Sequence, residues 1–152
     1  MSKKFSIAID AMGGDNSPDK IIEGIKFFLA KNKKNNDFII NIFGKKKIIY
    51  DKINQFNIKS NLINVIDSER VVSDDEAPIT AVKNSKNTSM WNSIKAQVDG
   101  DADISLSAGN TGVLFVISKM ILKMMKEVSK PALAGLWPSK KGMSVVLDLG
   151  AN

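Results

Sequence analysis

Three apolar, strand-like segments of this chain each stop at a turn built from Gly, small residues and Asp or Asn. The turns cover residues 10–15, 107–112 and 148–152, and aliphatic or β-branched residues precede each of them. In an open parallel α/β sheet, ligands bind beyond the carboxyl ends of the strands, where loops lead into helix N-termini. We therefore expect an α/β fold in which the three turns converge on one site.

The hydrophobic pattern predicts strands that alternate with helices. Strands are expected at residues 5–10, 38–43, 62–66, 102–106, 131–136 and 143–149, and helices at residues 18–31, 46–56, 89–98 and 111–126. The strand–helix–strand order predicts parallel strands joined by right-handed crossovers. Residues 67–87 are the least regular region. They contain an acidic cluster at 74–76, interpreted as a solvated loop, and a short helix is expected after Pro78.

Two helix starts carry recognisable signals. Ser17 is a good N-cap, and Pro18 suits the first helical position because its missing N–H costs nothing there. Thr88 is expected to cap the helix at residues 89–98. These signals predict where the first and third helices begin.

Composition excludes several classes of function. The 152 residues are 43% hydrophobic and 25% charged, as in a globular domain, and no apolar stretch approaches the ~20 residues that span a bilayer. The chain has no Cys and no His, so it cannot by itself assemble a disulfide, a Ser-His-Asp or Cys-His nucleophile system, or a thiolate or His-ligated zinc site. We expect a cytoplasmic protein that uses no metal and no cofactor.

The formal charge of +6 favours acidic partners, although scattered lysines are more simply a solvated surface. A single arginine, Arg70, and few aromatic residues argue against a nucleic-acid surface.

The turn at residues 107–112 has the composition of an anion-binding loop. Its glycines allow a phosphate to approach the backbone, and the helix that follows offers unpaired N–H groups. The residues concerned are Ser107, Gly109, Asn110, Thr111 and Gly112. Neither this turn nor the one at residues 10–15 matches a Walker A loop or a dinucleotide fingerprint. Considered alone, each turn is more simply explained as an ordinary connection between a strand and a helix.

Two carboxylates, Asp10 and Asp148, hold equivalent positions at strand ends. They can bind a hydroxyl, orient a lysine or hold a cation, and backbone capping is an equal alternative.

Five strings of residues match, in the same order, the signatures of one known enzyme family. They are Asp10–Pro18, Ser73–Pro78, Ser107–Gly112, Pro131–Ala134 and Leu147–Asn152. Through them the chain resembles the PlsX-type phosphate acyltransferases, which transfer a fatty acyl group from acyl carrier protein to inorganic phosphate. Full members are much longer, so the resemblance implies that residues 1–152 form the N-terminal α/β half of such an enzyme.

The resemblance also implies a setting for the reaction. The fold would be a truncated three-layer α/β structure with a mostly parallel sheet, like those of isocitrate dehydrogenase and phosphate acetyltransferase. The acyl phosphate would feed the acylation of glycerol 3-phosphate in bacterial phospholipid synthesis. Implied partners are the acyl carrier protein thioester, inorganic phosphate, a second copy in a homodimer, a downstream glycerol-phosphate acyltransferase and the inner face of the membrane. Many members carry His where this chain has Asn16.

Residue pattern and resemblance together predict a site without a protein nucleophile. Phosphate attack on a thioester needs an anion cradle and stabilisation of an oxyanion. We expect Asn110 and Asp148 to be catalytic. Residues expected to bind substrate or phosphate are Asp10, Gly13, Gly14, Asp15, Ser107, Gly109, Thr111, Gly112, Gly150 and Asn152. Two alternatives stay open: a phosphate acetyltransferase-like enzyme that uses acyl-coenzyme A, and an inactive fragment that acts as a binding module.

Overall fold

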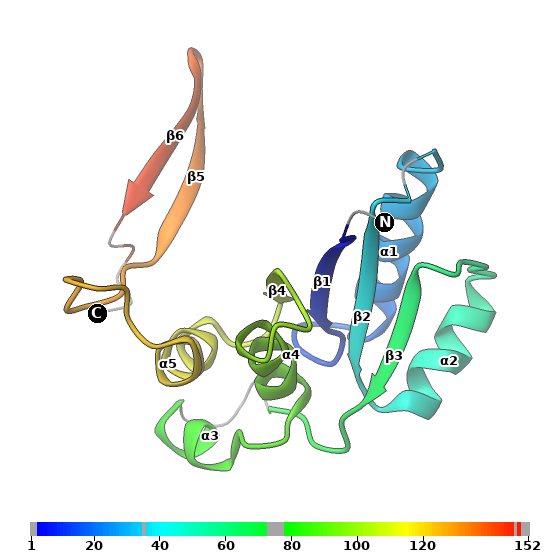
Figure 1. Ribbon diagram of the computed structural model, residues 1–152, viewed down its shortest axis with the longest axis horizontal. Helices are drawn as coiled ribbons and strands as arrows, with labels where there is room; N and C mark the ends of the chain where they lie inside the picture. Colours follow the sequence, from blue (N-terminus) through cyan, green and yellow to red (C-terminus); the bar gives the residue numbers. More distant parts are fainter. Residues whose placement is uncertain (1–2, 35, 73–77, 148, 150–152) are drawn as a thin grey trace.

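A computed structural model describes residues 3–34, 36–72, 78–147 and 149. Its centre is a four-stranded parallel sheet with the strand order β3–β2–β1–β4 (Figure 1). The strands are β1 (Phe5–Asp10), β2 (Phe38–Gly44), β3 (Ile63–Asp67) and β4 (Ile104–Ser107). The predicted parallel α/β architecture is confirmed.

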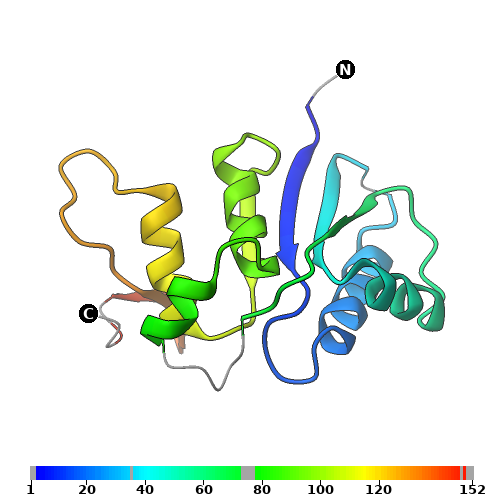
Figure 2. The same cartoon turned by 90° about the horizontal axis from the view of Figure 1, so that it is seen from below.

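Helices cover both faces of this sheet. The helices are α1 (Asp19–Lys31), α2 (Lys46–Gln55), α3 (Pro78–Asn84), α4 (Ser89–Val98) and α5 (Thr111–Leu122). Helices α1 and α2 pack on one face and α4 on the other, while α5 packs against α4 and α3 packs against α5. In Figure 2 the lime-green α4 lies between the yellow α5 and the blue β1. None of the described helices has both the length and the apolar character needed to cross a membrane.

Apolar side chains from these layers form three clusters. The α1–α2 side buries Ile22, Ile25, Ile40, Ile42 and Ile49. The α4 side of the sheet is filled by smaller residues and one ring, namely Ala8, Ala96, Ala102 and Phe43. Met90, Ile94, Val113 and Ile117 join α4 to α5. The last cluster places α5, and with it the loop that precedes α5, at the carboxyl edge of the sheet.

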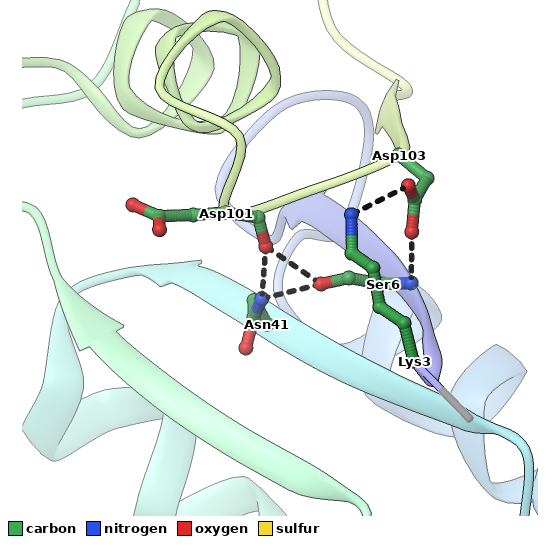
Figure 3. A network of polar contacts seen from close by, with 5 residues as sticks. All are labelled: Lys3, Ser6, Asn41, Asp101 and Asp103. Atoms are coloured by element: carbon green, nitrogen blue, oxygen red, sulfur yellow. Dashed lines mark hydrogen bonds and ion pairs between the residues drawn. The ribbon is translucent and has the colours of Figure 1, made fainter. Parts of the chain in front are cut away.

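A polar network holds the start of β4 against β1 (Figure 3). The Ser6 hydroxyl donates to the Asp101 carbonyl at 2.7 Å, and the Asn41 amide donates to the Ser6 hydroxyl at 3.0 Å. The Ser6 N–H donates to the Asp103 carboxylate at 2.7 Å, and Lys3 pairs with the same carboxylate at 3.4 Å. The Ser6 hydrogen bond is the main cause that lowers the pKa of Asp103. The network sets the register that continues to the site at the other end of the two strands.

Helix boundaries confirm one predicted cap and correct two other predictions. The Thr88 hydroxyl accepts from the Trp91 N–H at 3.2 Å, as expected of an N-cap. Ser17 does not cap α1: Pro18 is the N-cap residue, and the Ser17 hydroxyl instead donates to the Gly13 carbonyl.

Helix α5 is shorter than predicted. It ends at Leu122 rather than near residue 126, because Lys123 adopts a positive φ of 62°. Helices draw most of their stability from packing, and beyond Leu122 the chain is largely exposed; Met125, for example, is 76% exposed.

The two strands expected last in the chain are present but form a sheet of their own. β5 (Ala134–Ser139) and β6 (Gly142–Leu147) pair antiparallel as a hairpin, which Figure 1 shows beyond α5. The connection between them has two residues, and such a short link suits antiparallel strands but not a parallel pair. The strand before the third turn is therefore not a neighbour of β1 and β4 in the four-stranded sheet.

Candidate active site

The site is built on adjacent strand ends. Asp10, the last residue of β1, is paired in register with Ser107, the last residue of β4. The Ser107 hydroxyl donates to Asp10 Oδ2 at 2.7 Å, and the Met12 N–H donates to Asp10 Oδ1 at 3.1 Å. The Asp10 carboxylate is 1% exposed, so both of its oxygens are engaged inside the protein. Asp10 thus holds the loop from below, and its expected role in substrate binding stays a prediction.

Ser107 connects Asp10 to the glycine-containing loop at residues 107–112. Its hydroxyl oxygen accepts from the Gly109 N–H at 3.1 Å while its proton goes to Asp10. The loop is thereby held over the end of β4. The predicted residues Asp10, Ser107 and Gly109 thus form one continuous chain of hydrogen bonds.

The two turns touch backbone to backbone. A Cβ at Gly13 would lie 2.7 Å from Asp10 Oδ2 and 2.9 Å from Gly109 Cα. Gly14 has φ 89°, and a Cβ there would collide with the carbonyl oxygen of Ala108. Only glycine fits at these two positions, so the turns at residues 10–15 and 107–112 converge as predicted.

Asn110 starts α5 at the mouth of the site. Its side-chain Oδ1 accepts from the Val113 N–H at 3.1 Å, which makes Asn110 the N-cap. The first intrahelical bond, from the Leu114 N–H to the Asn110 carbonyl, measures 2.9 Å. The N–H groups of Thr111 and Gly112 precede that bond and lie in the first turn, where helix geometry supplies no partner. They are the donors that this helix end can offer to an anion.

These groups line a hollow of about 470 Å³ formed by both turns. The lining residues are Gly14, Asp15, Ala108, Gly109, Asn110, Thr111 and Gly112. Most of them were predicted as site residues; Ala108 was not, although it stands inside the predicted loop. Met12 and Met90 were also missed. Met12 contributes through its backbone N–H. A Cβ added at Gly109 would lie 2.8 Å from the Met90 methyl group, which is too close. No side-chain pattern signals either role.

The charge of this hollow is unbalanced. Asp15 is the one charged residue among the described residues that line it. Attraction for an anion therefore rests on the helix N-terminus and the backbone N–H groups. Among the described residues there is also no group of three acidic side chains that could hold a metal ion.

Most of the third predicted turn lies outside the part of the chain that the structure describes. Asp148, Gly150 and Asn152 lie outside the described residues, as does the acidic cluster at 74–76. Their proposed roles stay predictions.

Comparison with known proteins shows the family of this chain. The family model described as "Fatty acid synthesis protein" matches residues 5–152. A "Phosphate acyltransferase" of Pelagibacter ubique is 50% identical over 152 residues, which are 100% of this chain and 44% of the relative. Proteins of the same name from Rhodospirillum rubrum and Agrobacterium fabrum are 38% and 40% identical, over 100% and 96% of this chain and 43% and 41% of their own lengths.

The chain thus spans less than half the length of these relatives, while its own length is matched almost throughout. The relatives are named as acyltransferases, and the family as one of fatty acid synthesis. The chain belongs to the fatty acid synthesis protein family, that of the PlsX-type phosphate acyltransferases.

Proposed function

We propose that this chain supplies the phosphate side of an acyl-transfer site, in which a fatty acyl group passes from acyl carrier protein to inorganic phosphate. The observation that carries the proposal is the hydrogen-bonded chain Asp10–Ser107–Gly109 beneath the N-terminus of α5. It holds backbone donors in place before any ligand arrives. Such preorganised donors are what acyl transfer requires, because negative charge develops on the carbonyl oxygen.

The reaction needs no nucleophile from the protein. A phosphate oxygen attacks the thioester carbonyl carbon and the C–S bond breaks. The thiolate leaves on the carrier and takes up the proton that the phosphate loses, so the products are acyl phosphate and the free thiol. Thr111 and Gly112 would donate their N–H groups to the phosphate or to the developing oxyanion.

The side chains take different parts in this scheme. Asn110 uses its Oδ1 to cap α5, so its amide NH₂ is the group left to act on substrate. Asp10 and Ser107 are positioning residues, since their polar atoms contact each other and the loop. Asp15 carries a charge that opposes phosphate, so we assign it to orienting a hydroxyl or a cation and not to direct phosphate contact. Asp148, Gly150 and Asn152 keep their predicted roles in the same site.

A cation that balances the phosphate charge is still required. The residues that line the hollow include no Lys or Arg among those described. We propose that a Lys or Arg from the part of the relatives that the 152 residues do not cover supplies this positive charge. The same region is where we place the homodimer contact and the peripheral contact with the inner face of the membrane. In this proposal the enzyme is cytoplasmic and hands its product to a glycerol-phosphate acyltransferase.

The test uses an extended protein in which residues 1–152 are fused to the remaining part of the Pelagibacter ubique relative. Acyl phosphate release is measured from a palmitoyl thioester of acyl carrier protein and from palmitoyl-coenzyme A, each with inorganic phosphate. The proposal expects faster release from the carrier-protein thioester. A faster reaction with the coenzyme A thioester would support the acyl-coenzyme A alternative. A folded extended protein that releases acyl phosphate from neither would support the binding-module alternative.

A further inference from the structure

One face of the four-stranded sheet is only partly covered. On the side that carries α1 and α2, β1 presents Ile7 and Ile9, and β4 presents their register partners Ile104 and Leu106. Ile104 is 41% exposed and Leu106 is 47% exposed. Parallel sheets are normally buried on both faces by helices. We therefore expect another element to cover these four neighbouring apolar side chains.

A groove runs between this block and α1. It has a volume of about 360 Å³, and its lining is almost wholly apolar. Ile7, Ile9 and Leu106 form its floor, and Ile21 and Phe28 form its wall on α1. Gly24 stands between them on the same helix, and a Cβ added there would meet nothing within 4 Å. A second helix lying parallel to the sheet could approach α1 closely at this glycine.

We propose that this groove receives an amphipathic helix from the part of the family's length that lies outside residues 1–152. The relatives supply the chain needed, because 152 residues make up only 44% of the Pelagibacter ubique protein. A helix suits the place because it would lie in the same layer as α1 and α2 and complete the cover of β1 and β4. The proposal is independent of the acyl-transfer reaction and would hold for a catalytically inactive protein.

The natural absence of Cys makes the proposal directly testable by single-cysteine labelling. Leu106→Cys and Gly24→Cys are each introduced into the 152-residue chain and into the extended protein, whose added part has any Cys replaced by Ser. Lys47→Cys, on the exposed surface of α2, is the matched control. We expect a maleimide to modify both groove positions at least tenfold more slowly in the extended protein, with the control unchanged.

Equal labelling rates at the groove positions in the two proteins would overturn the proposal. Two other patterns would also overturn it by naming a different occupant. Protection in the 152-residue chain that grows with its concentration would indicate a second copy. Protection of the extended protein only after a palmitoyl thioester is added would indicate a site for the acyl chain.

A second variant guards against a misfolded cysteine mutant. Gly24→Trp places a large ring in open space in the 152-residue chain but in the path of the proposed helix. The melting temperature should fall in the extended protein and stay level or rise in the 152-residue chain. A melting temperature that changes equally in both would contradict the proposal.

Discussion

The Ser107 hydroxyl donates a 2.7 Å hydrogen bond to the buried carboxylate of Asp10, across 97 positions of sequence. The same hydroxyl accepts from the Gly109 N–H, so the end of β1 sets the position of the loop that begins α5. Polar groups at the other end of the same strands hold the register that makes this contact. Fold and candidate site are therefore linked through β1 and β4.

Removing the Asp10 carboxylate should cost stability. Asp10→Ala leaves the Ser107 hydroxyl and the Met12 N–H without their partner, and hydrogen bonds to a charged group contribute about 1.5–3 kcal/mol each. We expect the free energy of unfolding in urea to fall by about 3–6 kcal/mol, the loss of both bonds. Asp15→Ala removes an exposed carboxylate and should change it by less than about 0.5 kcal/mol. Similar losses in the two variants would contradict the organising role of Asp10.

Gly13 and Gly24 offer a matched pair of glycine substitutions. Gly13→Ala pushes a methyl group against the backbone of Gly109 and should destabilise the chain by about 1–3 kcal/mol. Gly24→Ala adds a methyl group in open space within α1 and should stabilise it by about 0.5–1 kcal/mol. Thermal or urea unfolding of both variants checks the opposite signs. A neutral Gly13→Ala would show that the two turns are not in close contact.

Capping by Asn110 can be separated from any chemical role. Asn110→Ala loses the acceptor for the Val113 N–H and should cost about 0.5–2 kcal/mol, whereas Asn110→Asp keeps an equally good N-cap. Unfolding in urea should therefore show near-native stability for the Asp variant and a loss for the Ala variant. If the Asp variant loses as much as the Ala variant, the cap seen at α5 does not explain the role of Asn110 in the fold.

We expect the Asp103 carboxylate to make the free energy of unfolding depend on pH in the acidic range. Its pKa is lowered in the folded chain, chiefly by the Ser6 N–H and also by Lys3, from an ordinary value of 3.8. A lowered folded pKa gives stability that is present above pH 3.8 and is lost as the pH falls through the folded pKa. The difference in unfolding free energy between the natural chain and Asp103→Asn should therefore be constant near neutral pH and shrink below pH 3.8. A difference that stays constant into that acidic range would rule out this contribution.

Much of the fold could be predicted because its signals are local. Alternating apolar residues marked β1, and an apolar run that stops at Gly44 marked β2. A threonine before an amphipathic segment marked the start of α4. The convergence of the first two turns followed from a general rule about parallel strands. That rule placed Asp10 and Ser107 at one edge without any contact being known.

The remainder depends on contacts between distant segments. The antiparallel pairing of β5 with β6 competes with addition to the main sheet, and strand pattern alone does not choose between them. Ser17 looks like an N-cap in sequence, yet its hydroxyl is taken by the Gly13 carbonyl once the first turn closes. The contact between Gly13 and Gly109 likewise exists only after β1 and β4 have paired.

The most direct test of the acyl-transfer site is the rate at which the Asn110→Asp extended protein forms acyl phosphate. The variant should keep the helix cap but replace the amide donors with a negative charge next to the phosphate. We predict near-native unfolding together with a loss of about 10²–10³ in rate, the usual cost of one oxyanion-hole donor. An Asn110→Asp protein that forms acyl phosphate as fast as the unmodified extended protein would contradict the assignment of this loop to phosphate and acyl transfer.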